Sequence, residues 1–259
     1  MSQSQRYREI MALLHRDQVV SVEELAQHFN VTVQTIRRDL TDLAESGRIE
    51  RVHGGAILPS GTVNIRYEER RTLQQSSKRT MAHQCAASIP NGASVFLNIG
   101  TSTEAVAKEL LHHKGLMVVT NNLNVAQILS RSDECDVYLT AGQMRRSDGG
   151  LVGNLAIQSI LQFKFDIAII GCSALDQDGD ILDFDVQEVA VSQTIIQQSR
   201  KTYLVADHTK FERTAPARIG SLADIDTWFT DAPAPQAVMQ LCAQWDTRIV
   251  APSVQTAPQ

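Results

Sequence analysis

The chain has 259 residues, enough for one or two domains at a typical size of roughly 150 residues each. Hydrophobic residues make up 43% and charged residues 20% of it, as in soluble globular proteins, which excludes a disordered or fibrous chain. No run approaches the ~18 apolar residues of a membrane span, and residues 1–20 lack a signal-peptide core, so the expected location is the cytoplasm. The four cysteines are far apart in sequence, which predicts neither a metal site nor disulfides, and no motif indicates a cofactor.

The net charge of −5 is distributed unevenly along the chain. Residues 1–71 contain 10 arginines, no lysine and 10 acidic residues, whereas residues 72–259 contain 14 basic and 19 acidic residues. The N-terminal part is therefore neutral overall. It can present a basic face only if its acidic side chains lie on another face, which the periodicity of the sequence has to decide.

Two short helices joined by a tight turn are predicted to follow an amphipathic helix at residues 5–16. Ser21 and Glu24 fit a capping box that begins the first of these helices, and Thr32 can cap the second. Apolar residues of the second helix fall on one stripe. Its opposite face carries Gln34, Thr35, Arg37, Arg38 and Thr41. This pattern is typical of a helix-turn-helix whose second helix places polar side chains in the major groove of DNA.

Residues 49–58 alternate apolar and polar side chains around a His-Gly-Gly turn, which predicts a two-stranded wing with Arg51 and His53 near its tip. Arginine can bind guanine or phosphate and glutamine can pair with adenine, so these residue types suit a DNA contact. The expected DNA-binding residues are Ser21, Thr32, Gln34, Thr35, Arg37, Arg38, Arg51, His53 and Gly54. The alternative is that these helices are solvated surface helices of an α/β enzyme.

A turn-rich stretch at residues 58–64 marks a domain boundary. We expect a winged helix-turn-helix domain at residues 3–58, a linker at 59–74, a larger domain at 75–250 and a flexible tail at 251–259. Apolar runs in the larger domain predict strands at residues 94–99, 116–120, 137–140, 167–170, 202–206 and 227–230. Such runs alternating with helical patterns indicate a largely parallel sheet covered on both faces, so the fold class is α/β.

A phosphate site is predicted where the first of these strands ends. Gly100, Thr101, Ser102 and Thr103 follow the strand and open a helix. Unpaired backbone N–H groups and the helix dipole therefore point at one place, which favours an anion. The same run can equally well form a plain helix cap.

Further candidate ligand residues follow the carboxyl ends of the strands, where α/β sheets bind ligands. Lys210 offers a charge for phosphate, and nearby amides and carboxylates offer partners for hydroxyl groups. The expected ligand-binding residues are Asn98, Gly100, Thr101, Ser102, Thr103, Asn121, Arg145, Asp148, Gly149, Gly150 and Lys210. The aspartates at residues 176–185 do not predict a calcium loop, because Ile181 and Gln187 stand where glycine and glutamate are required.

Residues 31–40, Val-Thr-Val-Gln-Thr-Ile-Arg-Arg-Asp-Leu, followed by His-Gly-Gly-Ala at 53–56, resemble the DeoR family of bacterial winged-helix repressors. The resemblance extends over residues 3–250. It implies a C-terminal sensor domain similar in fold to ribose-5-phosphate isomerase, with a phosphorylated sugar or polyol as effector. Segments 120–126, 182–185 and 230–233 resemble the members that regulate glycerol metabolism, which implies glycerol 3-phosphate.

Two places depart from the usual pattern of this family. Asn98 stands where aspartate is usual, and a Lys-Arg pair is usual near the positions of Ser192 and Gln193. Charge is therefore lost at both places.

The sequence thus predicts a sequence-specific repressor that glycerol 3-phosphate releases from its operator DNA. The alternatives are a repressor that responds to another sugar phosphate, or a sugar-phosphate isomerase-like enzyme. The enzyme is disfavoured because residues 171–175, where that fold would carry catalytic acids, contain none. A homo-oligomer with an even number of subunits, a dimer or tetramer, is expected because such repressors pair half-sites on DNA.

Overall fold

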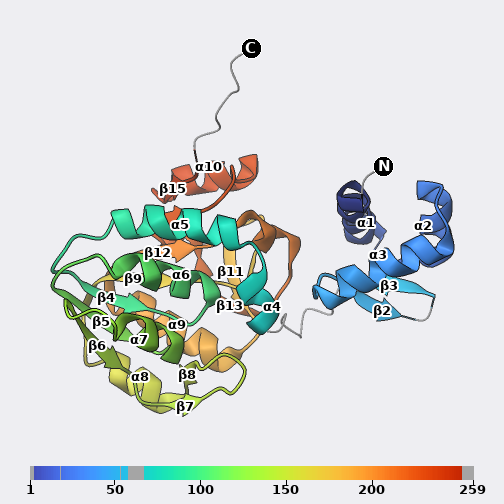
Figure 1. Cartoon of the computed structure of the whole chain (residues 1–259). Helices are drawn as coiled ribbons and strands as arrows, with labels where there is room; N and C mark the ends of the chain where they lie inside the picture. The colour runs from blue at the N-terminus through green and yellow to red at the C-terminus, as the bar shows by residue number, and fades with distance from the viewer. Residues whose placement is uncertain (1–2, 18, 53, 58–66, 253–259) are drawn as a thin grey trace. The chain divides into compact units, whose positions relative to one another are not determined.

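A computed structural model describes residues 3–17, 19–52, 54–57 and 67–252 of the chain (Figure 1). The chain divides into two compact units, Met1–Glu69 and Arg70–Gln259, each with its own hydrophobic core. Three expectations lie partly outside the described residues: His53, residues 59–66 of the linker, and residues 253–259 of the tail.

The N-terminal unit is a winged helix-turn-helix, as the sequence predicts. Its helices are α1 (Gln3–Asp17), α2 (Val22–Phe29) and α3 (Val33–Glu45). They bury a common core in which Ile10, Leu25 and Ile36 are among the fully enclosed side chains. The turn between α2 and α3 passes through Asn30, whose φ of 51° lies in the left-handed region that asparagine tolerates.

The wing has three strands instead of the predicted two. β2 (Glu50–Val52) and β3 (Gly55–Ile57) form the expected hairpin, and β1 (Val19–Ser21) pairs antiparallel with β3. A strand of three residues is too short for alternation to reveal it in the sequence. Gly55 permits the close pairing, because a Cβ atom there would lie 2.0 Å from the carbonyl oxygen of Val20.

The C-terminal unit contains a seven-stranded sheet in which every neighbouring pair is parallel. The strand order is β15-β14-β12-β9-β4-β5-β6. These strands are β4 (Ser94–Leu97), β5 (Leu116–Thr120), β6 (Cys135–Leu139), β9 (Phe165–Ile170), β12 (Ser199–Val205), β14 (Thr227–Phe229) and β15 (Arg248–Val250). The α/β fold class is confirmed.

Helices cover both faces of this sheet (Figure 1). One core includes side chains of α5 (Gln75–Ala87), α6 (Thr101–Leu110) and α7 (Leu123–Leu129). The other includes side chains of α8 (Asn154–Ile160), α9 (Val186–Gln197) and α10 (Gln236–Gln244). Alternation along the strands separates the two cores: Val95 and Leu97 of β4 join the first, and Phe96 joins the second.

Smaller elements surround the sheet. An antiparallel sheet joins β10 (Ala174–Leu175), β11 (Asp180–Asp183) and β13 (Ala217–Ser221), and a hairpin joins β7 (Gln143–Met144) to β8 (Leu151–Val152). Two short 3-10 helices are η1 (His208–Glu212) and η2 (Leu222–Asp224). The aspartate-rich run considered for calcium is the turn from β10 to β11, closed by a bond from the Gly179 N–H to the Asp176 carbonyl.

The range expected as a linker contains a helix, α4 (Tyr67–Thr72). Its sequence, Tyr-Glu-Glu-Arg-Arg-Thr, is short and lacks apolar periodicity, so the sequence pattern did not predict it. Along the described part of the chain, no helix is both long and apolar enough to cross a membrane.

The order of the parallel strands reverses between β4 and β9. From β4 the sheet continues through β5 to β6 on one side, and from β9 through β12 and β14 to β15 on the other. The carboxyl ends of β4 and β9 therefore border a crevice of the kind in which open parallel sheets bind ligands.

Candidate functional site

Side-chain caps build the helix-turn-helix. The Ser21 hydroxyl accepts a hydrogen bond from the Glu24 N–H at 3.1 Å, and the Glu24 carboxylate accepts one from the Ser21 N–H at 3.3 Å. This is the predicted capping box. Thr32 Oγ1 accepts from the Thr35 N–H at 3.2 Å and so begins α3. Both hydroxyls are engaged in fixing the ends of the helices.

The predicted polar face of α3 is exposed. Gln34, Arg37 and Arg38 are exposed, and Thr35 is half-buried and shares its hydroxyl with Thr32 at 2.9 Å. The apolar stripe on the other side is fully buried at Ile36, Leu40 and Leu43. Arginine and glutamine therefore project from the N-terminal half of the second helix, the part that contacts base edges in such motifs.

Arg51, which was expected near the tip of the wing, lies in β2 and contacts α3. Its guanidinium donates to the Arg37 carbonyl oxygen at 3.3 Å and to Thr41 Oγ1 at 3.0 Å. The side chain thus ties β2 to α3 and positions the helix. Gly54 is exposed and has a φ of 81°, which favours glycine.

An ion pair that the sequence analysis missed also holds α3. Asp39 is 1% exposed and accepts from Arg6 Nε at 2.7 Å. Next to it, the Tyr7 hydroxyl donates to Asp42 Oδ2 at 2.7 Å. Both acids face α1. The basic face of α3 is therefore free of these two carboxylates.

A pocket in the C-terminal unit opens at the predicted crevice. Three of its walls follow strand ends: residues 99–102 after β4, 171–173 after β9, and Asp207, Thr209 and Lys210 after β12. The other walls come from the α4–α5 segment and from β11 and α9. They contribute Arg70, Leu73, Gln74, Lys78, Asp183 and Glu188, and Arg213 completes the lining beyond η1.

Four of the predicted ligand residues line this pocket: Gly100, Thr101, Ser102 and Lys210. Gly100 precedes α6 with a φ of 144°, and its position has no side-chain cap. The first N–H groups of α6 therefore face the pocket, and no side chain at the N-cap position accepts a hydrogen bond from them.

The other seven predicted residues do not line the pocket: Asn98, Thr103, Asn121, Arg145, Asp148, Gly149 and Gly150. Asn121 follows β5, and the last four lie in the hairpin between β7 and β8, which follows β6 in the chain. β5 and β6 lie further from the reversal of strand order than β4 and β9. Thr103 is buried and its hydroxyl donates to the Asn98 carbonyl at 2.6 Å, so it shapes the loop. Asn121 is also buried, and its amide donates to the Leu151 carbonyl at 3.2 Å.

The two departures from the family pattern contact each other. Asn98 Nδ2 donates to Ser192 Oγ at 2.8 Å, and both side chains are buried. A hydrogen bond between two neutral side chains therefore joins the end of β4 to α9. Gln193 is exposed, and its amide donates to the Arg218 carbonyl at 3.1 Å.

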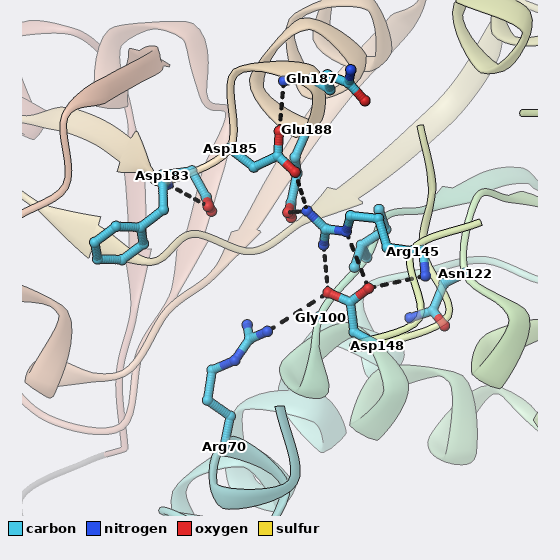
Figure 2. A network of polar contacts seen from close by, with 12 residues as sticks. Arg70, Gly100, Asn122, Arg145, Asp148, Asp183, Asp185, Gln187 and Glu188 are labelled. Atoms are coloured by element: carbon cyan, nitrogen blue, oxygen red, sulfur yellow. Dashed lines mark hydrogen bonds and ion pairs between the residues drawn. The ribbon is translucent and has the colours of Figure 1, made fainter. Parts of the chain in front are cut away.

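Arg145 and Asp148 do not line the pocket, but they contact residues that do (Figure 2). The Arg145 guanidinium contacts Asp148, Asp185 at 2.9 Å and Glu188 at 2.6 Å. Asp148 also lies 3.7 Å from Arg70. Burial acts to lower the pKa of Arg145, but Glu188 and Asp148 raise it more, so its guanidinium stays charged. Since Arg70 and Glu188 both line the pocket, the network positions two of its walls.

The cations of the pocket repel one another. Burial and the charge of Lys210 lower the pKa of Lys78 to about 8, and Arg70 and Arg213 act in the same direction. Burial and Arg213 likewise lower the pKa of Lys210. Asp207 opposes this repulsion, and its own pKa is lowered by Lys210 although burial acts to raise it. An anion in the pocket would relieve the repulsion.

Arg70, Lys78 and Arg213 were not predicted from the sequence. Arg70 and Lys78 precede β4 in a polar segment that gives no sign of facing a loop after a strand. Asp207 follows the predicted strand at residues 202–206 and begins the short stretch that contains the predicted Lys210. Its position in the sequence therefore indicated that it could line the site. Within the described ranges, no group of three or more histidine, cysteine or acidic side chains is placed to hold a metal ion.

Comparison with known proteins identifies both units. Residues 6–62 match the DeoR-like helix-turn-helix domain, and residues 73–232 match the DeoR C terminal sensor domain. The chain is 46% identical to the glycerol-3-phosphate regulon repressor of Escherichia coli, covering 93% of this chain and 96% of that protein. The protein of the same name from Haemophilus influenzae is 43% identical, covering 96% and 97%. Among solved structures, ribose 5-phosphate isomerase from Plasmodium falciparum matches with a TM-score of 0.39 at 11% identity, covering 52% of each chain.

The exposed face of α3 yields a first prediction. Arg37→Ala and Arg38→Ala should each weaken binding to operator DNA by about 1–3 kcal/mol where the side chain contacts a base, and should lower the salt slope by about one where it contacts a phosphate. Both side chains are exposed, so unfolding by heat should be unchanged. Fluorescence anisotropy over a salt series measures both effects, with Arg131→Ala, exposed in the other unit, as control. Unaltered affinity in both variants would contradict the assignment of α3.

Proposed function

Because the chain belongs to the DeoR family of transcriptional repressors, we propose that it represses genes of glycerol and glycerol 3-phosphate metabolism and that glycerol 3-phosphate releases it from its operator. The winged helix-turn-helix unit binds the operator, and the pocket of the C-terminal unit binds the effector. The alternative effector is another sugar phosphate, which would use the same phosphate-binding groups.

The observation that carries this proposal is the set of cations in the pocket beside the start of α6. Lys78, Lys210, Arg70 and Arg213 line one cavity together with Thr101 and Ser102. A phosphate dianion there forms charge-assisted hydrogen bonds to the cations and accepts from the first N–H groups of the helix. A neutral ligand gains neither.

The pocket also suits the rest of a phosphorylated polyol. Asp183 and Glu188 line it from β11 and α9, and carboxylates accept hydrogen bonds from hydroxyl groups. Burial and the neighbouring Asp183 raise the pKa of Glu188, while Arg145 opposes the shift. Cations for the phosphate and carboxylates for the hydroxyls therefore occur in one small site.

The pocket does not by itself distinguish a sensor from an isomerase. Residues 171–175 contain no acid, but Asp183, Glu188 and Asp207 bring carboxylates to the pocket from other elements. We infer a sensor because the pocket shares its chain with a DNA-binding unit and because the relatives are named repressors. An isomerase assay with ribose 5-phosphate that showed turnover would favour the enzyme.

We also infer that the protein acts in the cytoplasm, where operator DNA lies, as an even-numbered homo-oligomer. One winged helix contacts few bases, and pairing two of them on adjacent half-sites supplies specificity. The C-terminal unit exposes large apolar side chains near the edge strand β6: Tyr138, Leu139, Met144, Leu155 and Leu161. Exposed apolar groups at a sheet edge suit self-association.

The effector assignment predicts a ligand-blind repressor. Lys210→Ala should bind operator tightly but should no longer be released by glycerol 3-phosphate, because the change removes a phosphate partner and leaves the winged helix intact. Operator titrations with glycerol 3-phosphate, other sugar phosphates and glycerol measure this, and glycerol should have no effect. Release by a different sugar phosphate alone would replace the effector but keep the sensor. Failure of all phosphorylated compounds to bind would contradict the sensor.

A second prediction concerns protons. In the free pocket Lys78 has a pKa of about 8, because burial, Lys210, Arg70 and Arg213 disfavour its charge while Asp207 favours it. A bound phosphate dianion favours the charged form and raises this pKa. Binding at pH 8 should therefore take up roughly half a proton, and affinity should fall as the pH rises further.

Calorimetry at pH 8 in buffers of different ionisation enthalpy measures this uptake. The phosphate is already a dianion at that pH, so it contributes little. Lys78→Arg keeps its charge throughout and should lower the uptake to what other pocket groups with shifted pKa values, such as Lys210 and Glu188, contribute. An observed enthalpy that does not depend on the buffer in the unmodified protein would argue against Lys78 as a phosphate partner.

The oligomer can be tested by sedimentation. We expect an even number of subunits, and we expect Tyr138→Glu with Leu155→Glu to lower it, because burying two new carboxylates at an apolar contact is unfavourable. Met239→Glu, an exposed methionine on α10, is the matched control. A monomer that binds operator with full affinity would contradict the expectation.

A further inference from the structure

Groups that line the effector pocket also fasten helix α4. The Lys78 ammonium donates to the backbone carbonyls of Arg70 and Leu73, the latter at 2.8 Å. The Thr101 hydroxyl donates to the same Arg70 carbonyl at 3.5 Å. Lys78 and Thr101 both line the pocket. The donors that a phosphate would bind are therefore already in use by the backbone of this chain.

These carbonyls lie at the C-terminal end of α4. The last carbonyls of a helix have no partner within the helix and depend on donors from elsewhere. α4 has only 6 residues, and a helix of this length has little stability of its own. Lys78 and Thr101 supply donors where the helix needs them.

The position of α4 in the sequence, where the two units meet along the chain, bears on what this fastening does. β3 of the wing ends at Ile57, and α4, which begins at Tyr67, is the next described element. α4 is thus the part of the sensor pocket nearest in sequence to the DNA-binding unit. A change at its C-terminal end alters the segment through which the two units are joined.

The side chain of Arg70 ties α4 to the rest of the pocket. Its guanidinium lies 3.7 Å from Asp148, which Arg145 holds in the network with Glu188 (Figure 2). Arg70 and Glu188 both line the pocket. The last turn of α4 is therefore held through a backbone carbonyl by pocket groups, and through a side chain by Asp148 beside the pocket.

We propose that the effector's phosphate competes with the C-terminal end of α4 for Lys78 and Thr101, and that this competition couples effector binding to release of DNA. The idea rests on the proposed function, because it requires a phosphorylated ligand in this pocket. Without ligand, the ammonium and the hydroxyl hold the carbonyls of Arg70 and Leu73. With ligand, they bind phosphate oxygens, because a hydrogen bond to an ionised acceptor is stronger than one to a neutral carbonyl.

This competition explains how the effector shifts the equilibrium between a state that binds operator and a state that binds it poorly. A ligand favours one of two states only by its difference in affinity for them. Here the state with α4 fastened binds operator, and the state with Lys78 and Thr101 turned to the ligand binds it poorly. Loss of the fastening should therefore imitate the effector.

The test compares two pocket lysines. Lys78→Met removes the donor but keeps the length of the side chain, and we expect about tenfold weaker operator binding with no ligand present. Lys210→Met removes a pocket lysine that lies on η1, which is far from α4 in the sequence. We expect it to remain bound to operator and to lose its response to glycerol 3-phosphate.

Anisotropy titrations of both variants, with and without glycerol 3-phosphate, separate the possibilities. If Lys78→Met binds operator as tightly as the unmodified protein, the competition is wrong, because Lys78 then serves only the ligand. If the unmodified protein binds glycerol 3-phosphate and is released, the proposed function stands regardless of that result. If it binds no phosphorylated compound, both ideas fail.

Hydrogen exchange on the unmodified protein gives a measurement that does not depend on the folding of a variant. Glycerol 3-phosphate should speed exchange of the backbone amides at residues 70–78 and slow exchange at residues 100–103. Inorganic phosphate at high concentration should act in the same direction. Slower exchange in both segments would overturn the competition, since it would mean that the ligand tightens α4.

Discussion

Repulsion between like charges is the constraint on which the sensor pocket depends. Two lysines and two arginines line one small cavity, and burial deprives them of water that would screen them. Burial and repulsion from Lys210 together outweigh the attraction of Asp207, so the pKa of Lys78 is lowered. The fold accepts the arrangement because the reversal of strand order brings three loops to one edge of the sheet. Its stability elsewhere, in two large apolar cores, allows a site that is unfavourable when empty.

In the N-terminal unit, side-chain contacts hold the charged helix α3 without covering the face that carries Arg37 and Arg38. Arg6 pairs with Asp39 from one side and Arg51 bonds to the backbone of α3 from another. Both arginines hold the helix in place. They leave Arg37 and Arg38 exposed, and a neutral unit thereby presents a positively charged surface.

Much of this architecture could be predicted from the sequence because it depends on local rules. The caps at Ser21 and Thr32, the apolar stripe of α3 and the Gly100 turn each appear within a few residues of sequence. What could not be predicted depends on contacts between distant segments. Lys78 reaches the pocket from a polar helix, and Asp39 is buried only because Arg6 meets it. By sequence, the loops after β5 and β6 are as suitable for ligand binding as the loop after β4. Only the strand order places them away from the crevice.

The bond between Asn98 and Ser192 bears on how such a protein diverges from its relatives. The two residues are 94 positions apart in the sequence and meet in a buried place where an amide donates to a hydroxyl. A carboxylate at 98 with serine opposite, or a lysine at 192 with asparagine opposite, would leave a buried charge without a counterion. Either single change would therefore be destabilising in this chain. Only a paired change that puts opposite charges at both positions would keep each buried group with a partner.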